Sequence, residues 1–247
     1  MRKTLFLALA GALASQGIAP AQSAKQTVQV SRVTLIEQTT TTGGWTTILG
    51  NADPTAANAV RIHTSQQKDL ILVSSIECGL LTKTRTKSSG GNADTETATA
   101  TVKLRILVDP GPGGAFVAAT RIAEPGSDPT PDASDDTGIN YCHRKQQLTA
   151  KLQGIITGAC FPGGVFDPTV PGCLLDEEIE LLLETLEASS FSFVLDDLGA
   201  GVHNIIVQAK IDTSASSADS EAKGLVGRGA LTVEEVRLVK NQGILVP

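Results

Sequence analysis

The chain has 247 residues, of which 20 are Lys or Arg and 26 are Asp or Glu, so its formal net charge at pH 7 is −6. Affinity for nucleic acid depends on Lys and Arg that neutralise phosphates, and anionic membranes attract basic segments, so we expect this acidic chain to bind neither. Acidity of this degree mainly favours solubility.

The first residues have the composition of a secretory signal peptide. Two positive residues precede a ten-residue apolar run at 5–14, and an A-x-A cleavage pattern ends at Ala21. The run is too short to span a bilayer, which takes about 20 residues, and no later run is long and apolar enough. We therefore predict a signal peptide over 1–21, with cleavage after Ser23 as the second choice. The remaining protein, 22–247, is expected to be one secreted domain, extracellular or periplasmic, without membrane insertion.

Alternation of apolar and polar residues with a period of two is typical of β-strands. In the segment 101–108, Val102, Leu104 and Ile106 share one face while Lys103 lies on the other. Similar segments occur at 30–37, 69–80, 191–195, 202–211 and 229–240. Turn signals separate them, and they do not alternate regularly with helices. The sequence therefore predicts a mainly β fold, an antiparallel β-sandwich that is jelly-roll-like.

A hairpin with a threonine ladder is predicted between two of these strands. Residues 82–87 and 94–99 flank the turn sequence SSGGNA. Pairing them would bring Arg85 opposite Glu96 on one side and threonines together on the other. The threonines are Thr82, Thr84, Thr86, Thr95, Thr97 and Thr99. We interpret the hairpin as a solvent-exposed tip, and a flat hydroxyl surface that binds a glycan or ice is the alternative.

A small helical insert is predicted at about 142–190. From Leu148, apolar residues recur at i, i+4, i+7 and i+8, and from Ile179 they recur at i, i+3, i+4 and i+7. Both patterns are typical of one face of a helix, and Asp176 could cap the second helix. We therefore expect two amphipathic helices, one with a basic and one with an acidic polar side, joined by a loop rich in Gly and Pro.

The four cysteines are Cys78, Cys142, Cys160 and Cys173. In an exported chain they are expected to form two disulfides, and no C-x-x-C pair supports a zinc site. Of the three possible pairings we favour two bonds. One is Cys160–Cys173, which closes the loop between the predicted helices, and the other is Cys78–Cys142, which ties the insert to a strand. An oxidised Cys142 cannot act as a nucleophile with the adjacent His143.

Two further places could bind ligands. The loop 124–138 clusters carboxylates that could hold calcium through oxygen ligands, with Asp132, Asp135 and Asp136 as the candidates, and a solvated loop is the alternative. Trp45, the only tryptophan, could stack on a sugar ring of a glycan or pack in the core beside a turn.

Sequence motifs of known catalytic sites are absent. The three histidines His63, His143 and His203 are scattered without metal-binding spacing, and there is no G-x-S-x-G elbow or P-loop. Asp196 and Asp197 are interpreted as turn residues, because Asp commonly bonds its own backbone in turns. We therefore expect no catalytic residues, and no cofactor apart from calcium at the aspartate loop.

Three functions fit this sequence. The preferred one is a secreted, non-enzymatic structural or adhesive protein that associates with itself at a cell surface or in the extracellular matrix. The alternative is a module that binds a surface glycan, a protein or another ligand. The third is a secreted hydrolase, which would need a pocket that joins a histidine, an acid and a nucleophile from distant parts of the chain.

Overall fold

The computed structural model contains two six-stranded antiparallel sheets and one two-stranded sheet. The described residues are 26–30, 36–38, 44–88, 93–111, 114–121, 138–151, 155–167, 169–175 and 177–237. The predicted signal peptide lies outside them, and so do Asp132, Asp135 and Asp136. Among the described residues, no helix has the length and apolar character needed to cross a membrane.

The first sheet has the strand order β1–β14–β5–β12–β8, with β2 also beside β14. Its strands are β1 (Gln26–Val30), β2 (Ile36–Gln38), β5 (Lys68–Ser88), β8 (Thr120–Arg121), β12 (Glu177–Leu198) and β14 (Glu221–Val236). β5 is the central strand, because β12 pairs along one side of it and β14 along the other.

The second sheet has the order β3–β13–β6–β7, with β4 beside β13 and β9 beside β6. Its strands are β3 (Thr46–Leu49), β4 (Val60–Thr64), β6 (Ala93–Val108), β7 (Val117–Ala118), β9 (Ile139–Lys151) and β13 (Gly201–Ala215). The two sheets pack face to face in a sandwich-like arrangement, and one apolar cluster draws its members from both of them.

The core consists of the alternating apolar residues that the sequence identifies. Leu70 and Leu72 of β5 and Leu104 and Ile106 of β6 belong to this cluster, and all four are fully buried. Burial of each such side chain contributes roughly 1.5–3 kcal/mol. The predicted strands at 69–80, 101–108 and 202–211 are confirmed, and each has a predominantly apolar face that lines this core, although the first also buries Ser74 and the third His203.

The predicted two-helix insert at about 142–190 is wrong. More than half of its described residues lie in the two strands β9 and β12, and the only helical elements among the described residues between these strands are short 3-10 turns at Gly158–Cys160 and Pro162–Gly164. β9 pairs with β6, and β12 pairs with β5 along nearly its whole length. Pairing with strands that are distant in the sequence therefore overrides the local helical pattern.

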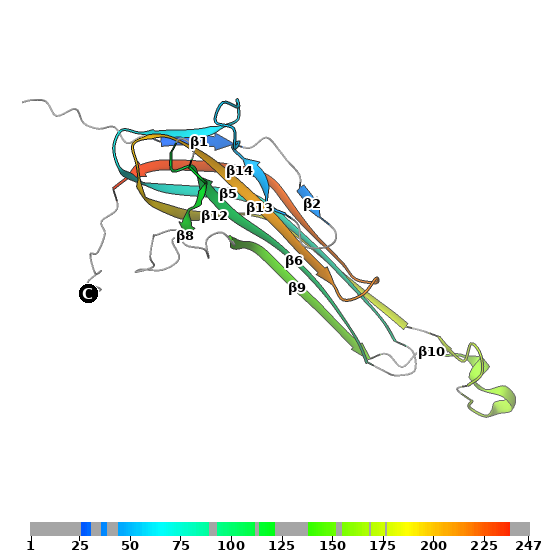
Figure 1. Cartoon of the computed structure of the whole chain (residues 1–247). Helices are drawn as coiled ribbons and strands as arrows, with labels where there is room; N and C mark the ends of the chain where they lie inside the picture. Colours follow the sequence, from blue (N-terminus) through cyan, green and yellow to red (C-terminus); the bar gives the residue numbers. More distant parts are fainter. Residues whose placement is uncertain are drawn as a thin grey trace, which may run out of the picture.

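The strands β5, β6, β9 and β12 form an arm that extends beyond the ends of β13 and β14 (Figure 1). We define the arm as residues 79–88, 93–101, 143–151 and 177–187 of β5, β6, β9 and β12, and the head as the described residues on the other side of the Cys78–Cys142 disulfide. The connection between β13 and β14 lies part-way along the arm, at 216–220. β5 has 21 residues, and at about 3.3 Å per residue it spans about 70 Å.

The predicted hairpin of 82–87 with 94–99 is also wrong. β5 and β6 belong to different sheets, and their facing sides form the interior of the arm. Arg85 pairs with Glu178 and Glu180 of β12 and not with Glu96. The β5 threonines are buried inside the arm, whereas the β6 threonines lie on the opposite face of their sheet from the buried Ala98. The buried set is Thr82, Thr84 and Thr86, and the outward set is Thr95, Thr97 and Thr99. A single exposed array of all six is therefore excluded.

A small lobe, the described residues from 155 to 175, lies beyond the end of the arm (Figure 1). Its strands β10 (Ile155–Ile156) and β11 (Leu174–Leu175) pair with each other. The disulfide Cys160–Cys173 closes the loop between them, and the second disulfide joins Cys78 to Cys142. The favoured cysteine pairing is thus confirmed, although Cys142 ties a strand, not a helix, to β5.

Candidate interaction surface

β12 forms an edge of the first sheet along the arm. One side of β12 pairs with β5, and on the other side the described residues provide only β8, which pairs at Phe193 and Val194. Between 178 and 188, no described strand lies on that outer side. An open edge of this length presents backbone N–H and C=O groups to which another strand can pair.

Apolar side chains crowd this open edge. The exposed fractions of Ile179, Leu181, Leu182, Leu183 and Leu186 lie between 38% and 73%. The odd-numbered residues share a face with the buried threonines of β5, and the even-numbered residues lie on the outer face, so both faces of the edge carry apolar groups. Contiguous exposed apolar surface of this kind marks interaction sites on soluble proteins.

Cations from β5 compensate the glutamates near the end of the arm. The Glu180 carboxylate lies 3.1 Å from Lys83 Nζ and 3.0 Å from Arg85 Nη2, and Glu178 lies 3.1 Å from Arg85 Nε. Hydrogen bonds from Lys83, and next from Arg85, hold the pKa of Glu180 below its ordinary value. These glutamates therefore oppose the approach of another strand less than isolated carboxylates would.

Gln146 fixes the interior of the arm. Its amide oxygen accepts a hydrogen bond from the Thr82 hydroxyl at 2.6 Å, and its amide nitrogen donates to the Thr84 hydroxyl at 2.7 Å and to the Leu181 carbonyl at 2.8 Å. Small buried residues such as Ala98 line the opposite sheet. One side chain of β9 therefore holds both β5 and β12, which keeps the open edge in place.

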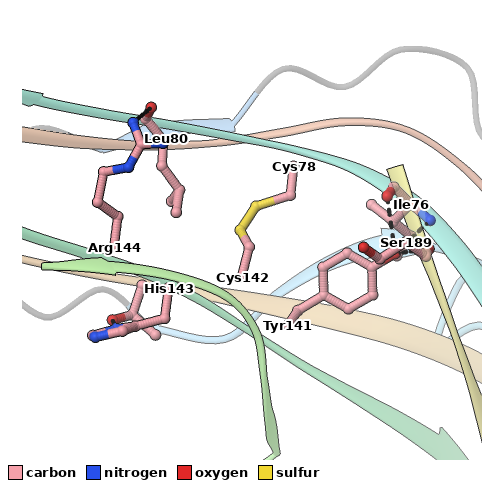
Figure 2. The surroundings of a disulfide bond; sticks show 9 residues. Ile76, Cys78, Leu80, Tyr141, Cys142, His143, Arg144 and Ser189 are labelled. Carbon is pink, nitrogen blue, oxygen red and sulfur yellow. Dashed lines mark hydrogen bonds between the residues drawn. A yellow bond between two sulfur atoms is a disulfide. The ribbon is translucent and has the colours of Figure 1, made fainter. Parts of the chain in front are cut away.

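At the base of the arm, β9 reaches across to the first sheet (Figure 2). Cys142 pairs with Val102 and Asn140 pairs with Lys103, so Tyr141 is an extra residue, a β-bulge in β9. A bulge lets two consecutive side chains point the same way, and both Tyr141 and Cys142 are buried. The sheets are therefore joined here by a covalent bond and by a phenol.

The Tyr141 hydroxyl lies among the backbone groups that join β5 and β12. It accepts a hydrogen bond from the Ile76 N–H at 2.8 Å, and the carbonyls of Ile76, at 2.9 Å, and of Ser189 are within its reach as acceptors. Burial raises the pKa of Tyr141 above its ordinary value of 10.0. His143 points away from this junction and bonds the Thr101 hydroxyl at 2.8 Å.

The lobe carries a second apolar surface. The rings of Phe161 and Phe166 lie 5.6 Å apart, and both are exposed together with Ile156 and Val165. The Thr157 hydroxyl accepts a hydrogen bond from the Ala159 N–H and so caps the first 3-10 turn. The two apolar surfaces thus belong to the arm and to the lobe at its end.

Trp45 is partly covered. The guanidinium carbon of Arg105 lies 4.4 Å from the centre of its ring, a cation–π contact that covers one ring face. The ring also lies against Gly138, where an added Cβ would come within 2.5 Å of it. Its partners are therefore residues next to the second sheet, and the structure does not group it with the buried threonines of the arm.

One histidine lies beside a hydroxyl. Nε2 of His203 is 3.0 Å from Oγ1 of Thr64, but both residues have an exposed fraction of 0%. The ring also contacts the backbone carbonyls of Asp109 and Gly199, so it holds the connection between β12 and β13. A buried pair of this kind is closed to a substrate.

The predicted turn acids line a small pocket next to this connection. Asp196 and Asp197 line it with Leu195, Leu198 and other residues, none of which is a histidine or a hydroxyl nucleophile. Asp197 has a φ of 54°, and its N–H bonds the Asp69 carboxylate, as suits a turn. Among the described residues, no group of three or more His, Cys, Asp or Glu is placed to hold a metal ion.

The sequence prediction missed the open edge, Gln146 and the bulge at Tyr141. A signal for the edge is present in the run Leu181–Leu183, because three consecutive apolar residues fit neither face of an ordinary surface strand. No local signal reveals the roles of Gln146 and Tyr141, since their partners come from β5 and β12.

No protein-family model and no curated protein matches the chain. Solved structures similar to it include that of infectious bursal disease virus of the Gx strain, with 8% identity over 86% of this chain and 40% of that chain and a TM-score of 0.19. The structure of the Gt strain gives 9% identity over 87% of this chain and 42% of that chain, with a TM-score of 0.20. Virus-derived T=1 particles give 10% identity over 89% of this chain and 41% of that chain, with a TM-score of 0.21. The chain spans about two fifths of the length of these viral chains, and TM-scores this low carry no conclusion about its fold or function.

Proposed function

We propose that this chain is a secreted, non-enzymatic structural or adhesive protein that associates with copies of itself. The observation that carries the proposal is the open edge of β12, where exposed apolar side chains accompany backbone groups that no described strand pairs. Burial of apolar surface favours association, and pairing of the edge would satisfy its backbone groups.

The finer fold within this proposal is a jelly-roll sandwich. The short strands β2, β7, β8, β10 and β11 are set aside, and β3 and β4 count as one strand. The eight long strands that remain can then be renumbered from 1 to 8 in chain order. In these numbers the first sheet has the order 1-8-3-6 and the second sheet the order 2-7-4-5. The eight strands pair as they would if the chain were folded once into a long antiparallel hairpin, with its first strand beside its last and its two middle strands beside each other. These antiparallel pairs are β1 with β14, β3 and β4 with β13, β5 with β12, and β6 with β9. Wrapping such a ribbon into two facing sheets gives a jelly roll, which supports the proposal.

Secretion is proposed from the chemistry of the cysteines. Both pairs form disulfides, and disulfides persist in oxidising compartments. The alternatives have less support, since Trp45 is stacked by Arg105 and the buried Thr64–His203 pair is closed to a substrate.

The mass of the mature protein in solution tests the proposal. Light scattering during size exclusion should give a dimer or larger species that forms with rising concentration. Leu186→Glu, on the open edge, should raise the apparent dissociation constant at least tenfold, because a negative charge replaces the most exposed leucine of an edge that already carries several glutamates. Val202→Glu introduces the same charge at another exposed apolar residue, in the head, and should leave association unchanged. A wild-type protein that stays monomeric at every concentration would overturn the proposal.

A further inference from the structure

We infer that a second copy of the chain pairs with β12 edge to edge and antiparallel, about a two-fold axis that passes beside Leu183. This inference rests on the proposed self-association and specifies its geometry. The resulting interface would continue the first sheet from one molecule into the next.

The hydrogen bonds of Tyr141 indicate which backbone groups are available at the edge. Its hydroxyl touches the N–H and C=O of Ile76 and the C=O of Ser189, so the backbone groups of these two paired residues face each other between β5 and β12. Backbone groups alternate in direction along a strand. The even-numbered residues from 178 to 188 therefore direct their N–H and C=O groups toward the open edge.

Symmetry then restricts the register. A two-fold axis perpendicular to the sheet joins outer face to outer face, so even-numbered residues pair with even-numbered residues and odd with odd. An axis at Leu182 would place Glu180 of each copy opposite Glu184 of the other, and an axis at Glu184 would place that residue opposite itself. Like charges directly opposite each other are destabilising, which disfavours both registers.

An axis at Leu183 avoids these contacts. Each even-numbered residue then faces an even-numbered residue of the other copy, and none of these pairs joins two glutamates. The pairs are Leu182 with Glu184, Glu180 with Leu186, and Glu178 with Ala188. Among the odd-numbered residues, Leu183 faces its own copy and Leu181 faces Thr185. The exposed side chains of Leu181 and Leu183 from both copies then form one continuous apolar strip beside the interior of the arm.

Strand β8 disfavours the remaining registers that keep the glutamates apart. An axis at Thr185 would bring the partner's Glu177 opposite Phe193. An axis at Leu186 would bring the partner's Ile179 opposite Phe193. β8 already pairs with β12 at Phe193 and Val194. With the axis at Leu183, Glu177 of the partner comes opposite Ser189, and the partner strand stays clear of β8.

Cysteine cross-linking tests this register. Leu183→Cys would place two thiols opposite each other across the axis, in an odd-numbered pair without backbone hydrogen bonds. Such pairs have Cα atoms about 4.5 Å apart, within the roughly 4.4–6.8 Å range of disulfides. The matched controls are Leu182→Cys, which would face Glu184, and Thr185→Cys, which would face Leu181. Under mild oxidation of the secreted protein, Leu183→Cys should give at least fivefold more disulfide-linked dimer than either control.

A proline provides a second variant that does not depend on oxidation. The N–H of Leu182 points to the open edge, so Leu182→Pro should preserve pairing with β5 and block pairing with a second copy. Dimer mass should be lost while the unfolding midpoint of the monomer stays within a few degrees of the wild type.

The outcomes separate the inference from the function on which it rests. Preferential cross-linking at Thr185→Cys would overturn the register. If Leu182→Pro forms dimers as readily as the wild type, and Leu183→Cys gives no cross-link, the edge pairing would be overturned. Self-association through another surface would then still stand. A wild-type protein that is monomeric at every concentration would overturn both.

Discussion

Tyr141 shows how a single side chain can join three strands of the two sheets. Its ring comes from β9, and its hydroxyl lies among backbone groups of β5 and β12. It stacks at a tilt on Phe191, with the ring centres 5.2 Å apart. Removing the hydroxyl alone would leave the buried N–H of Ile76 without this acceptor, and a buried unsatisfied donor costs about 1–3 kcal/mol.

We therefore expect Tyr141→Phe to lower the free energy of unfolding by about 1–3 kcal/mol, measured by urea unfolding at pH 8. The deficit should shrink at alkaline pH. Because burial raises the pKa of folded Tyr141, its stabilising effect is complete below its ordinary value of 10.0 and is lost as the pH rises through the raised pKa. As Tyr141 is the only tyrosine, its ionisation can be followed by absorbance in the wild type. Ionisation of the folded protein below pH 10 would contradict the prediction.

At the scale of elements, the two disulfides constrain different parts of the molecule. Cys78–Cys142 joins the two sheets at a sequence separation of 64, whereas Cys160–Cys173 closes the lobe at a separation of 13. The buried residues of the main apolar cluster include the first pair but neither cysteine of the second. The first bond therefore stabilises the fold of the sheets, and the second stabilises the lobe.

Paired substitution of Cys78 and Cys142 by alanine should lower the free energy of unfolding by about 2–4 kcal/mol. The same substitution of Cys160 and Cys173 should leave the main unfolding transition nearly unchanged and make the exposed Phe161 and Phe166 more sensitive to chymotrypsin. Chemical denaturation and limited proteolysis measure the two effects. Equal losses of global stability in the two variants would contradict this division.

The sequence predicts those strands that have one apolar face, and its errors have physical causes. β9 directs the polar Gln146 and the bulged Tyr141 inward, so its period of two is hidden. β12 exposes leucines on both faces of an edge, and their spacing imitates a helix. The sequence places Thr82 in solvent, because the partner that satisfies its hydroxyl inside the arm, Gln146, comes from a strand distant in the chain. The open edge of the candidate interaction surface is not predicted by the sequence, because the β5 residues that pair with β12 lie about 100 residues away in the chain.

At the scale of the whole molecule, the arm sets the shape. A compact chain of 247 residues has a radius of gyration of about 18 Å, whereas β5 alone extends for about 70 Å. The head and the lobe lie at opposite ends of the arm (Figure 1). A monomer with this shape should scatter X-rays with a radius of gyration well above the compact value.

Edge pairing about Leu183 predicts a further change of shape on association. The paired β12 strands run antiparallel along a shared arm, so the two heads lie at opposite ends of the dimer. Small-angle X-ray scattering of the dimer should therefore give a distance distribution with a second maximum, which arises from vectors between the two heads. Leu182→Pro should remove this maximum and restore the curve of the elongated monomer. A dimer with a single compact maximum would place the heads side by side, which an antiparallel pairing of the arms does not allow.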